Sequence, residues 1–225
     1  MSTSPNLVTE LVAARQRDSR RLLIVLHGLG DSMEGYRWMP LALRLPWLNY
    51  LLVNAPDDYF GGYSWYDLGG DAVSGVARSR GLLIALLESL AARGYSPEQT
   101  AMFGFSQGCL MTLETGLRYP HRLAGLVGIS GYVQDVHALV REASSVARQT
   151  KVLMTHGTHD PLLRIDPVRE QVAVLKDAGF DLTWREFDKE HTIAGEDELN
   201  LIREFISGCF ADGGPEGPRD SVARR

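Results

Sequence analysis

Apolar residues follow two patterns along this chain. Some form short continuous runs, and others recur every three or four positions over longer stretches. A run without polar interruption, such as residues 22–26, is typical of a strand that is covered on both faces. The runs predict strands, the first of them a short edge strand, at residues 7–13, 21–26, 48–56, 100–105, 123–129, 151–155 and 182–187. The helical spacing predicts helices at residues 33–45, 71–92, 109–118, 135–148, 168–178 and 196–206.

Strand and helix alternate from residue 21 to residue 208. That alternation predicts right-handed crossovers and therefore an α/β fold, a mostly parallel twisted sheet with helices on both faces. We see neither an internal repeat nor a linker, so we expect one domain over residues 1–210. Residues 211–225 are rich in glycine, proline and charge and have little to bury, and we expect this tail to be disordered.

The pattern G-x-S-x-G follows one of the predicted strands, at Gly104-Phe105-Ser106-Gln107-Gly108. It indicates a strand that turns sharply into a helix, with Ser106 at the apex. The flanking glycines lack Cβ atoms, which relieves the crowding that such a turn creates. A pattern this short also arises by chance, so its meaning depends on the residues that accompany it.

The candidate residues all follow directly after predicted strands: His27-Gly28-Leu29, Ser106, Asp160 and His191. Ligands of open parallel sheets gather at the carboxyl ends of the strands, so these residues are expected to share one edge. A serine hydroxyl needs a base within hydrogen-bond reach and a carboxylate that orients this base. The order Ser106, Asp160, His191 is the order that a strand–turn–helix nucleophile uses.

Other histidines and aspartates compete for these roles. Backbone packing is the expected role of His27 and His156, whereas His121 and His137 fall in or beside helical stretches and His159 neighbours the proposed acid. Among the carboxylates, Asp181 precedes its strand and Asp166 is expected to cap a helix. Asp188 could reach the site, so it remains an alternative to Asp160.

Attack by serine on a carbonyl creates an oxyanion, which needs preorganised N–H donors about 3 Å away. Gln107 follows the nucleophile at a helix N-terminus, so its backbone N–H is one candidate. The glycines of His27-Gly28-Leu29-Gly30 let the backbone approach closely, which makes the N–H of Leu29 the second. The alternative is that these glycines only build a tight turn.

Composition narrows the function classes. The 225 residues are 44% hydrophobic and 23% charged, as in ordinary soluble proteins, and the net charge of −5 argues against nucleic acid as a partner. No apolar run approaches the roughly 20 residues of a membrane helix, and we find no signal peptide, so no stable membrane insertion is expected. The two cysteines, Cys109 and Cys209, lack metal-ligand spacing and favour a reducing, cytoplasmic location. No specific role for Cys109 follows from the sequence.

Taken together, five blocks resemble the phospholipase/carboxylesterase family of α/β-hydrolases, which includes the acyl-protein thioesterases. The blocks are His27–Ser32, Ser64-Trp65-Tyr66-Asp67, Gly104–Gly108, His156–Pro161 and His191, and the resemblance extends over residues 20–208. It implies the α/β-hydrolase fold, with Ser106 as nucleophile, His191 as base and Asp160 as acid. It also implies an oxyanion hole from the N–H groups of Leu29 and Gln107, cleavage of carboxylic esters or thioesters, and neither metal nor organic cofactor.

Only eight residues separate Pro56 from Trp65, where eukaryotic thioesterases carry a longer substrate-covering loop. We therefore expect a minimal lid and a shallow site for short to medium acyl chains. Tyr59, Phe60 and Tyr63 offer apolar surface to the acyl group, unless they simply pack onto the domain. Further candidates for the pocket wall are Trp65, Leu68, Leu162 and Ile193.

The sequence thus predicts a serine carboxylesterase that acts on small-molecule or acyl (thio)ester substrates, as a monomer or a homodimer. An acyl-protein thioesterase or a lysophospholipase would use the same residues and differ in pocket shape. A dienelactone-type hydrolase would usually carry cysteine in place of Ser106, and a peptidase of this fold would need an extra gating domain. A non-catalytic binding module is the remaining alternative.

Overall fold

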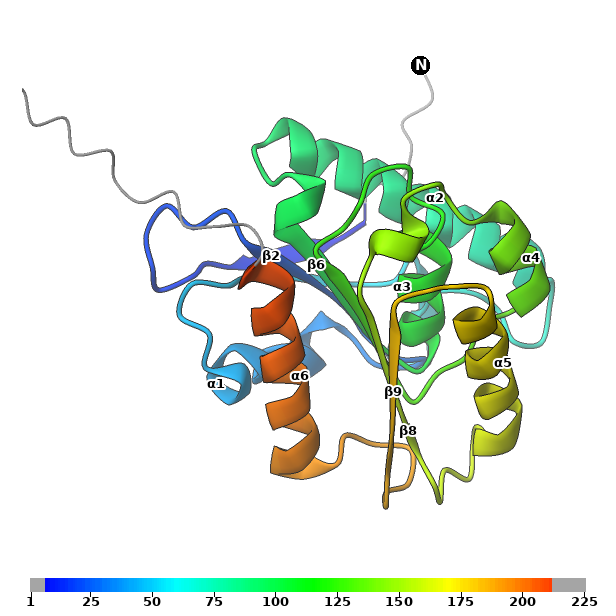
Figure 1. Cartoon of the computed structure of the whole chain (residues 1–225). Coiled ribbons are helices and arrows are strands. Elements are labelled where there is room, and N and C mark those ends of the chain that lie inside the picture. The colour runs from blue at the N-terminus through cyan, green and yellow to red at the C-terminus, as the bar shows by residue number, and fades with distance from the viewer. Residues whose placement is uncertain (1–6, 212–225) are drawn as a thin grey trace, which may run out of the picture.

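The computed structural model describes residues 7–211, and its centre is a seven-stranded sheet in the order β1-β3-β2-β6-β7-β8-β9 (Figure 1). Its strands are β1 (Thr9–Val12), β2 (Leu22–Leu26), β3 (Asn49–Val53), β6 (Thr100–Phe105), β7 (Gly125–Ile129), β8 (Val152–Gly157) and β9 (Leu182–Phe187). Strand β1 pairs antiparallel with β3 at the edge, and all other neighbours pair parallel. The expected mostly parallel sheet is confirmed.

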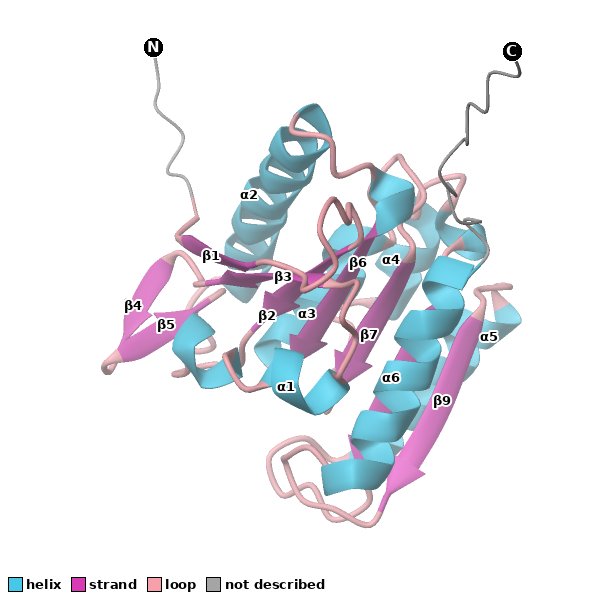
Figure 2. Cartoon of the chain, turned by 90° about the vertical axis from the view of Figure 1, so that its left-hand side faces the viewer, coloured by secondary structure: helices cyan, strands magenta, loops and turns pink. Residues whose placement is uncertain are grey.

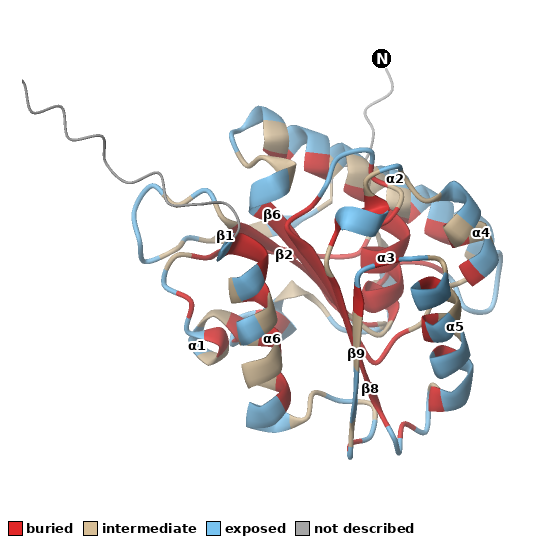
Figure 3. Ribbon diagram, viewed as in Figure 1, coloured by how far each residue is buried: buried red, intermediate tan, exposed pale blue. Residues whose placement is uncertain are grey.

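Helices cover both faces of the sheet (Figures 1 and 3). One layer contains α2 (Ala72–Ala92), α3 (Gln107–Gly116), α4 (Val136–Glu142) and α5 (Ile165–Asp177), and the other contains α1 (Met39–Leu43) and α6 (Gly195–Ala211). Strand β2 shows why both layers form: Leu22, Ile24 and Leu26 belong to one core cluster, whereas Leu23 and Val25 belong to the other. Burial on both faces explains the continuous apolar run.

The stretch expected to be one helix over residues 33–45 is broken into two short pieces. A 3-10 helix, η1, spans Met33–Tyr36, and α1 follows at Met39–Leu43. Pro40 lies in the first turn of α1, where a backbone N–H has no partner within the helix, so its absence costs nothing. In the interior of one helix over residues 33–45 the same proline would break the hydrogen-bond ladder. Arg44 ends α1 in the left-handed conformation, with φ of 51°. The expected helix over 135–148 is likewise α4 followed by a 3-10 turn, η3 (Ala147–Gln149), and another such turn, η2 (Pro97–Gln99), precedes β6.

Residues 57–64, expected to be a loop, form a small hairpin beside the main sheet (Figure 2). Strands β4 (Asp57–Tyr59) and β5 (Gly62–Ser64) are joined by Phe60 and Gly61, whose φ angles of 45° and 91° are those of a two-residue hairpin turn. The hairpin is bonded to the loop after β2: the Gly30 N–H donates to the Tyr63 carbonyl, and the Tyr63 N–H donates to the Asp31 carbonyl, each at 2.9 Å.

At the C-terminal end of the described chain, α6 continues to Ala211, so the helix includes the first residue of the expected tail. The rest of that tail, residues 212–225, lies outside the described residues. Among residues 7–211, no helix is both long and apolar enough to span a bilayer.

Candidate active site

Ser106 lies at the turn between β6 and α3 with φ of 54° and ψ of −116°, a conformation that side chains rarely adopt. Close packing holds it there. A Cβ on Gly104 would lie 2.0 Å from the carbonyl oxygen of Gly108, and a Cβ on Gly108 would lie 2.2 Å from that of Leu26. The Ser106 N–H donates to the carbonyl of Ile129 at 2.9 Å, which fixes the turn to β7. The predicted strand–turn–helix at Ser106 is therefore present.

Asp160 and His191 are joined by a hydrogen bond of 2.7 Å between Oδ2 and Nδ1. The other oxygen of Asp160 accepts the backbone N–H groups of Leu162 and Leu163, each at 2.9 Å. Burial of Asp160 favours the neutral acid, but the hydrogen bonds from Leu163 and His191 outweigh it and hold the pKa of Asp160 below its ordinary value. Asp160 is therefore an anion fixed to face His191.

The alternative acid, Asp188, lies elsewhere. Its carboxylate is 2.9 Å from Nε2 of His159, and both side chains are exposed. A further histidine, His156, is buried behind Asp160, with Nε2 at 3.5 Å from Oδ2. The same nitrogen is 2.8 Å from the carbonyl of Leu163, to which it donates. Burial lowers the pKa of His156, so this imidazole is a neutral support for the acid loop.

His191 packs against Phe105, next to Ser106 in the chain. The ring centroids of His191 and Phe105, the residue directly before Ser106, are 4.9 Å apart. Both side chains line an open cleft of about 320 Å³. Its other lining residues are Asp31, Gly35, Tyr36, Trp38, Thr192 and Ile193. Ile193 was expected in the pocket wall; the aromatic residues from 33–45 were missed because that stretch was assigned to one regular helix.

The loop after β2 packs directly against Ser106. A Cβ on Gly28 would lie 3.2 Å from the Phe105 ring and 3.4 Å from the Cβ of Ser106. His27 holds this loop, because its Nδ1 donates to the Gly28 carbonyl at 2.6 Å and its Nε2 accepts the Ala55 N–H at 3.0 Å. Burial lowers the pKa of His27, which keeps the ring neutral, as the acceptor nitrogen requires.

Two backbone N–H groups at this junction were expected to form an oxyanion hole. Within residues 7–211, neither the N–H of Leu29 nor that of Gln107 donates a hydrogen bond to another residue. Gln107 is the first residue of α3, where intrahelical partners are lacking and the helix dipole favours negative charge. The N–H of Gln107 directly follows Ser106, and Leu29 follows Gly28, which packs against Ser106.

The side chain of Gln107 has a role that the sequence did not reveal. Its Oε1 accepts the Trp65 N–H at 3.0 Å, and its Nε2 donates to the Tyr66 carbonyl at 2.9 Å. The Trp65 indole donates to the carbonyl of His27 at 2.9 Å and has no exposed surface. Trp65 was expected in the pocket wall, but it lies in the core and ties the loop after β2 to the elbow.

The other expected pocket residues lie outside the cleft. Tyr59 packs edge-on against Phe60 and lies over Gly30, at 3.6 Å from the position of a Cβ there. Phe60 is 97% exposed at the hairpin turn, and Tyr63 is half-buried near His27. Leu68 and Leu162 are mostly exposed. A role for these side chains in substrate binding stays a prediction.

A buried ion pair anchors the loop that carries His191. Both oxygens of Glu198, in the first turns of α6, accept from the ammonium of Lys189, at 2.6 and 2.8 Å. Glu198 also accepts the Ala194 N–H at 2.5 Å and the hydroxyl of Thr155 in β8. One carboxylate thus holds the chain on both sides of His191. Sequence reasoning missed it, because charged residues in a loop and a helix usually face solvent.

Comparisons with known proteins identify the family. The profile of the Phospholipase/Carboxylesterase family matches residues 8–210. The chain belongs to this family. Acyl-protein thioesterase 1 of Yarrowia lipolytica is 32% identical over 205 residues, covering 82% of this chain and 89% of the relative. A probable carboxylesterase of Oryza sativa subsp. japonica is 27% identical over 217 residues, and the alignment covers 89% of this chain and 82% of the relative.

A solved structure has the same fold. The crystal structure of esterase PE8 superposes with a TM-score of 0.82 at 29% identity, covering 91% of this chain and all of that one. The resemblance drawn from the motifs is confirmed, and this phospholipase/carboxylesterase family member is a hydrolase with the α/β-hydrolase fold.

Proposed function

We propose that this chain is a serine carboxylesterase that hydrolyses carboxylic esters or thioesters through an acyl-enzyme on Ser106. The observation that carries the proposal is the Asp160–His191 hydrogen bond, at the sheet edge where Ser106 lies at a strained elbow. The unpaired N–H groups of Leu29 and Gln107 beside the serine support it, as do the names of the relatives.

The mechanism follows from the hydrogen bond that His191 makes with Asp160. Nδ1 of His191 donates to Asp160, so Nε2 is the basic nitrogen and takes the proton of the Ser106 hydroxyl as Oγ attacks the substrate carbonyl. The N–H groups of Leu29 and Gln107 stabilise the oxyanion. The protonated His191 then gives its proton to the departing alcohol or thiol. Water, deprotonated by the same imidazole, releases the acid and restores Ser106.

The cleft bears on the choice of substrate. Its walls include Tyr36, Trp38 and Ile193, it is open to solvent, and its volume of about 320 Å³ is near the lower end for small-molecule sites. The short β4–β5 hairpin, the stretch expected to form a minimal lid, contributes no lining residue to this cleft. These features favour short to medium acyl groups. An acyl-protein thioesterase is the second candidate, favoured by the relatives of that name. A lysophospholipase, a cytoplasmic location and a monomeric or dimeric state stay predictions.

The test is a panel of p-nitrophenyl esters from acetate to palmitate, with an octanoyl thioester beside it, on wild type, Ser106→Ala and Ser89→Ala. We expect Ser106→Ala to lower kcat/KM by about 10⁴-fold or more. Ser89 is an exposed residue of α2, and its variant should keep the wild-type rate. Retention of turnover in Ser106→Ala would refute the nucleophile, and the highest kcat/KM on palmitate would refute the short-chain preference.

A further inference from the structure

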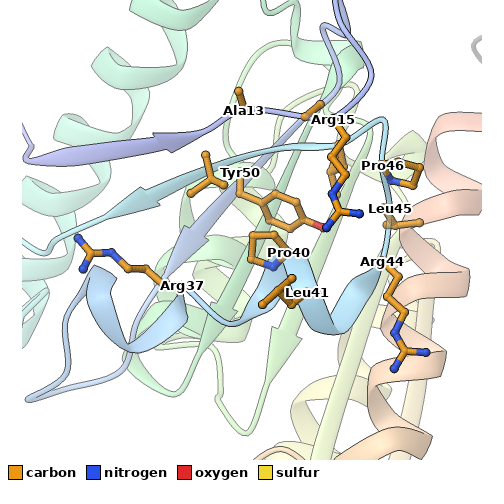
Figure 4. Close-up of a pocket in the computed structure, with 12 residues that line it drawn as sticks. Ala13, Arg15, Arg37, Pro40, Leu41, Arg44, Leu45, Pro46 and Tyr50 are labelled. Carbon is orange, nitrogen blue, oxygen red and sulfur yellow. The ribbon is translucent and has the colours of Figure 1, made fainter.

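A second cavity, larger than the catalytic cleft, lies at the other end of the sheet. It has a volume of about 450 Å³ and is bounded by the end of β1, the start of β3 and helix α1 (Figure 4). Tyr50, the second residue of β3, lines it. The catalytic residues, by contrast, follow the carboxyl ends of β6, β8 and β9. The proposed esterase mechanism uses no residue of this cavity.

Tyr50 brings an unpaired donor to this cavity. Its side chain is 2% exposed, and its hydroxyl has no hydrogen-bond partner among the described residues. Burial raises the pKa of Tyr50, so the phenol stays protonated and able to donate. Buried hydroxyls in native proteins are nearly always paired, and an exception calls for an explanation.

The charged residues that line the cavity are all arginines: Arg15, Arg37 and Arg44. Arg37 is bonded to Glu10 at 2.6 Å. Arg15 and Arg44 are exposed, and neither forms an ion pair or a side-chain hydrogen bond with any residue in the described part of the chain. Figure 4 shows the guanidinium group of Arg15 projecting toward the hydroxyl end of Tyr50. The Arg44 side chain projects away from Tyr50 in the same view, so Arg15 is the cation without a counter-charge among the described residues that lies at the hydroxyl, in a protein whose net charge is −5.

The remaining lining is apolar. Leu41 of α1 is 70% exposed, and Pro40, Leu45 and Leu48 lie in the same wall. Apolar walls with a few convergent polar groups, in a volume between about 300 and 1,000 Å³, are the usual features of small-molecule sites. Arginine and phenol groups both donate to anionic oxygens, and arginine matches carboxylate and phosphate equally well.

We propose that this cavity binds an organic anion, a compact apolar body that carries a carboxylate or phosphate group. The anionic group binds Arg15 and accepts a hydrogen bond from the hydroxyl of Tyr50, which becomes uncovered when the exposed Arg15 side chain turns to the ligand. Arg44, at the rim of the cavity, adds a second positive charge. The apolar body lies on Leu41 and Leu48. The site is separate from Ser106 and does not depend on the esterase proposal.

Calorimetric titration of the Ser106→Ala protein tests the site. The probes are hexanoate, hexyl phosphate, inorganic phosphate and hexanol. We expect hexanoate or hexyl phosphate to bind at least about tenfold more tightly than hexanol, because a charge-assisted hydrogen bond contributes roughly that factor. Tighter binding of hexyl phosphate than of hexanoate assigns the head group to phosphate, and the reverse assigns it to carboxylate. Inorganic phosphate should bind more weakly than hexyl phosphate because it leaves the apolar wall exposed.

Variants place the binding at this cavity rather than at the catalytic cleft. Tyr50→Phe and Arg15→Gln should each weaken the binding by about tenfold. Arg141→Gln makes the same change in charge on α4, which packs on the opposite face of the sheet, and should leave binding unchanged. Without ligand, Tyr50→Phe should keep or raise the melting temperature, since it removes only an unpaired hydroxyl.

Three results would overturn the proposal. One is the absence of binding by both hexanoate and hexyl phosphate. Another is binding that Tyr50→Phe and Arg15→Gln leave unchanged, which would move the anion to the catalytic cleft. The third is a lower melting temperature of Tyr50→Phe, which would show that the hydroxyl already has a partner in the folded protein.

Discussion

Gly104 lies so close to the first turn of α3 that a methyl group has no room there. The clash involves the backbone carbonyl of Gly108, which cannot move without shifting α3. At this position the sequence predicted the cause as well as the pattern, because the crowding of a sharp strand–turn–helix is a local property of the backbone.

Replacing this glycine should therefore destabilise the protein and inactivate it. We expect Gly104→Ala to lower the free energy of unfolding by about 2 kcal/mol or more, by analogy with other overpacked sites, and to lower kcat. Gly81 is the matched control: it lies in α2, and a methyl group added there would have nothing within 4 Å of it. Gly81→Ala should stabilise the protein by up to about 1 kcal/mol. Urea unfolding and ester turnover measure both, and equal stability of the two variants would contradict the argument.

Hydrogen bonds between side chains and residues far apart in the sequence could not be predicted from the sequence. Nothing in the sequence links Gln107 to Trp65 and Tyr66, because the contact depends on how the hairpin region folds back onto the elbow. Asp160 and His191 were found because they follow strands of a parallel sheet. Trp65 was expected in the pocket wall because it belongs to a motif near the site, but its side chain is buried in the core beneath the site.

The loop between β9 and α6 carries His191, the base of the proposed mechanism. Glu198 holds its shape by bonding to Lys189 before His191 and to Ala194 after it. Burial lowers the pKa of Lys189, and Glu198 opposes that shift. In the proposed mechanism Glu198 is accordingly a positioning residue that acts through His191.

Glu198→Gln leaves the ammonium of Lys189 buried without a counter-ion. Removal of one partner of a buried pair typically destabilises a protein by about 3–5 kcal/mol. We expect a lower melting temperature and a kcat reduced by about tenfold with KM nearly unchanged, because the cleft walls stay in place while the base is misplaced. Glu196→Gln, an exposed change in the same helix, should behave as wild type. A wild-type kcat in folded Glu198→Gln would contradict the positioning role.

Among the elements, the buried strands were predictable because their apolar runs are continuous. The stretch 33–45 was not, because Pro40 and the left-handed Arg44 limit α1 to a single short piece. The hairpin was missed because a Phe-Gly turn lacks the usual asparagine or aspartate signal, and only its pairing with Gly30 and Asp31 reveals it.

For the molecule as a whole, acid should lower stability in two stages. His27 and His156 are buried with lowered pKa values, so the unfolded chain takes up protons first as the pH falls below about 6.5. Above about pH 6.5 both histidines are neutral in the folded and the unfolded chain, and their contribution to stability is complete. This contribution decreases as the pH falls from about 6.5 to the lower pKa of each histidine in the folded state. The pKa of Asp160 is lowered in the folded state, so Asp160 contributes to the free energy of unfolding above about pH 3.9. This contribution is lost as the pH falls below about 3.9 and through the folded pKa.

Urea titrations at intervals from pH 7.5 to pH 3 measure both stages. We expect the unfolding free energy to fall between pH 7 and pH 5, and to fall again below pH 4. His137 is exposed on α4, and His137→Gln should leave the first stage unchanged. An unfolding free energy that is constant from pH 7 to pH 5 would contradict the neutral, buried state of both imidazoles.

The two cysteines are buried in different layers. Cys109 belongs to the core between the sheet and α2–α5, where burial raises its pKa to about 12, and Cys209 belongs to the core beneath α1 and α6. An alkylating reagent attacks thiolates that it can reach, so each sulfur is protected until its own layer opens. The alkylation rate of each cysteine therefore measures how often its own side of the sheet opens, and the order in which the two thiols react reports which side opens first.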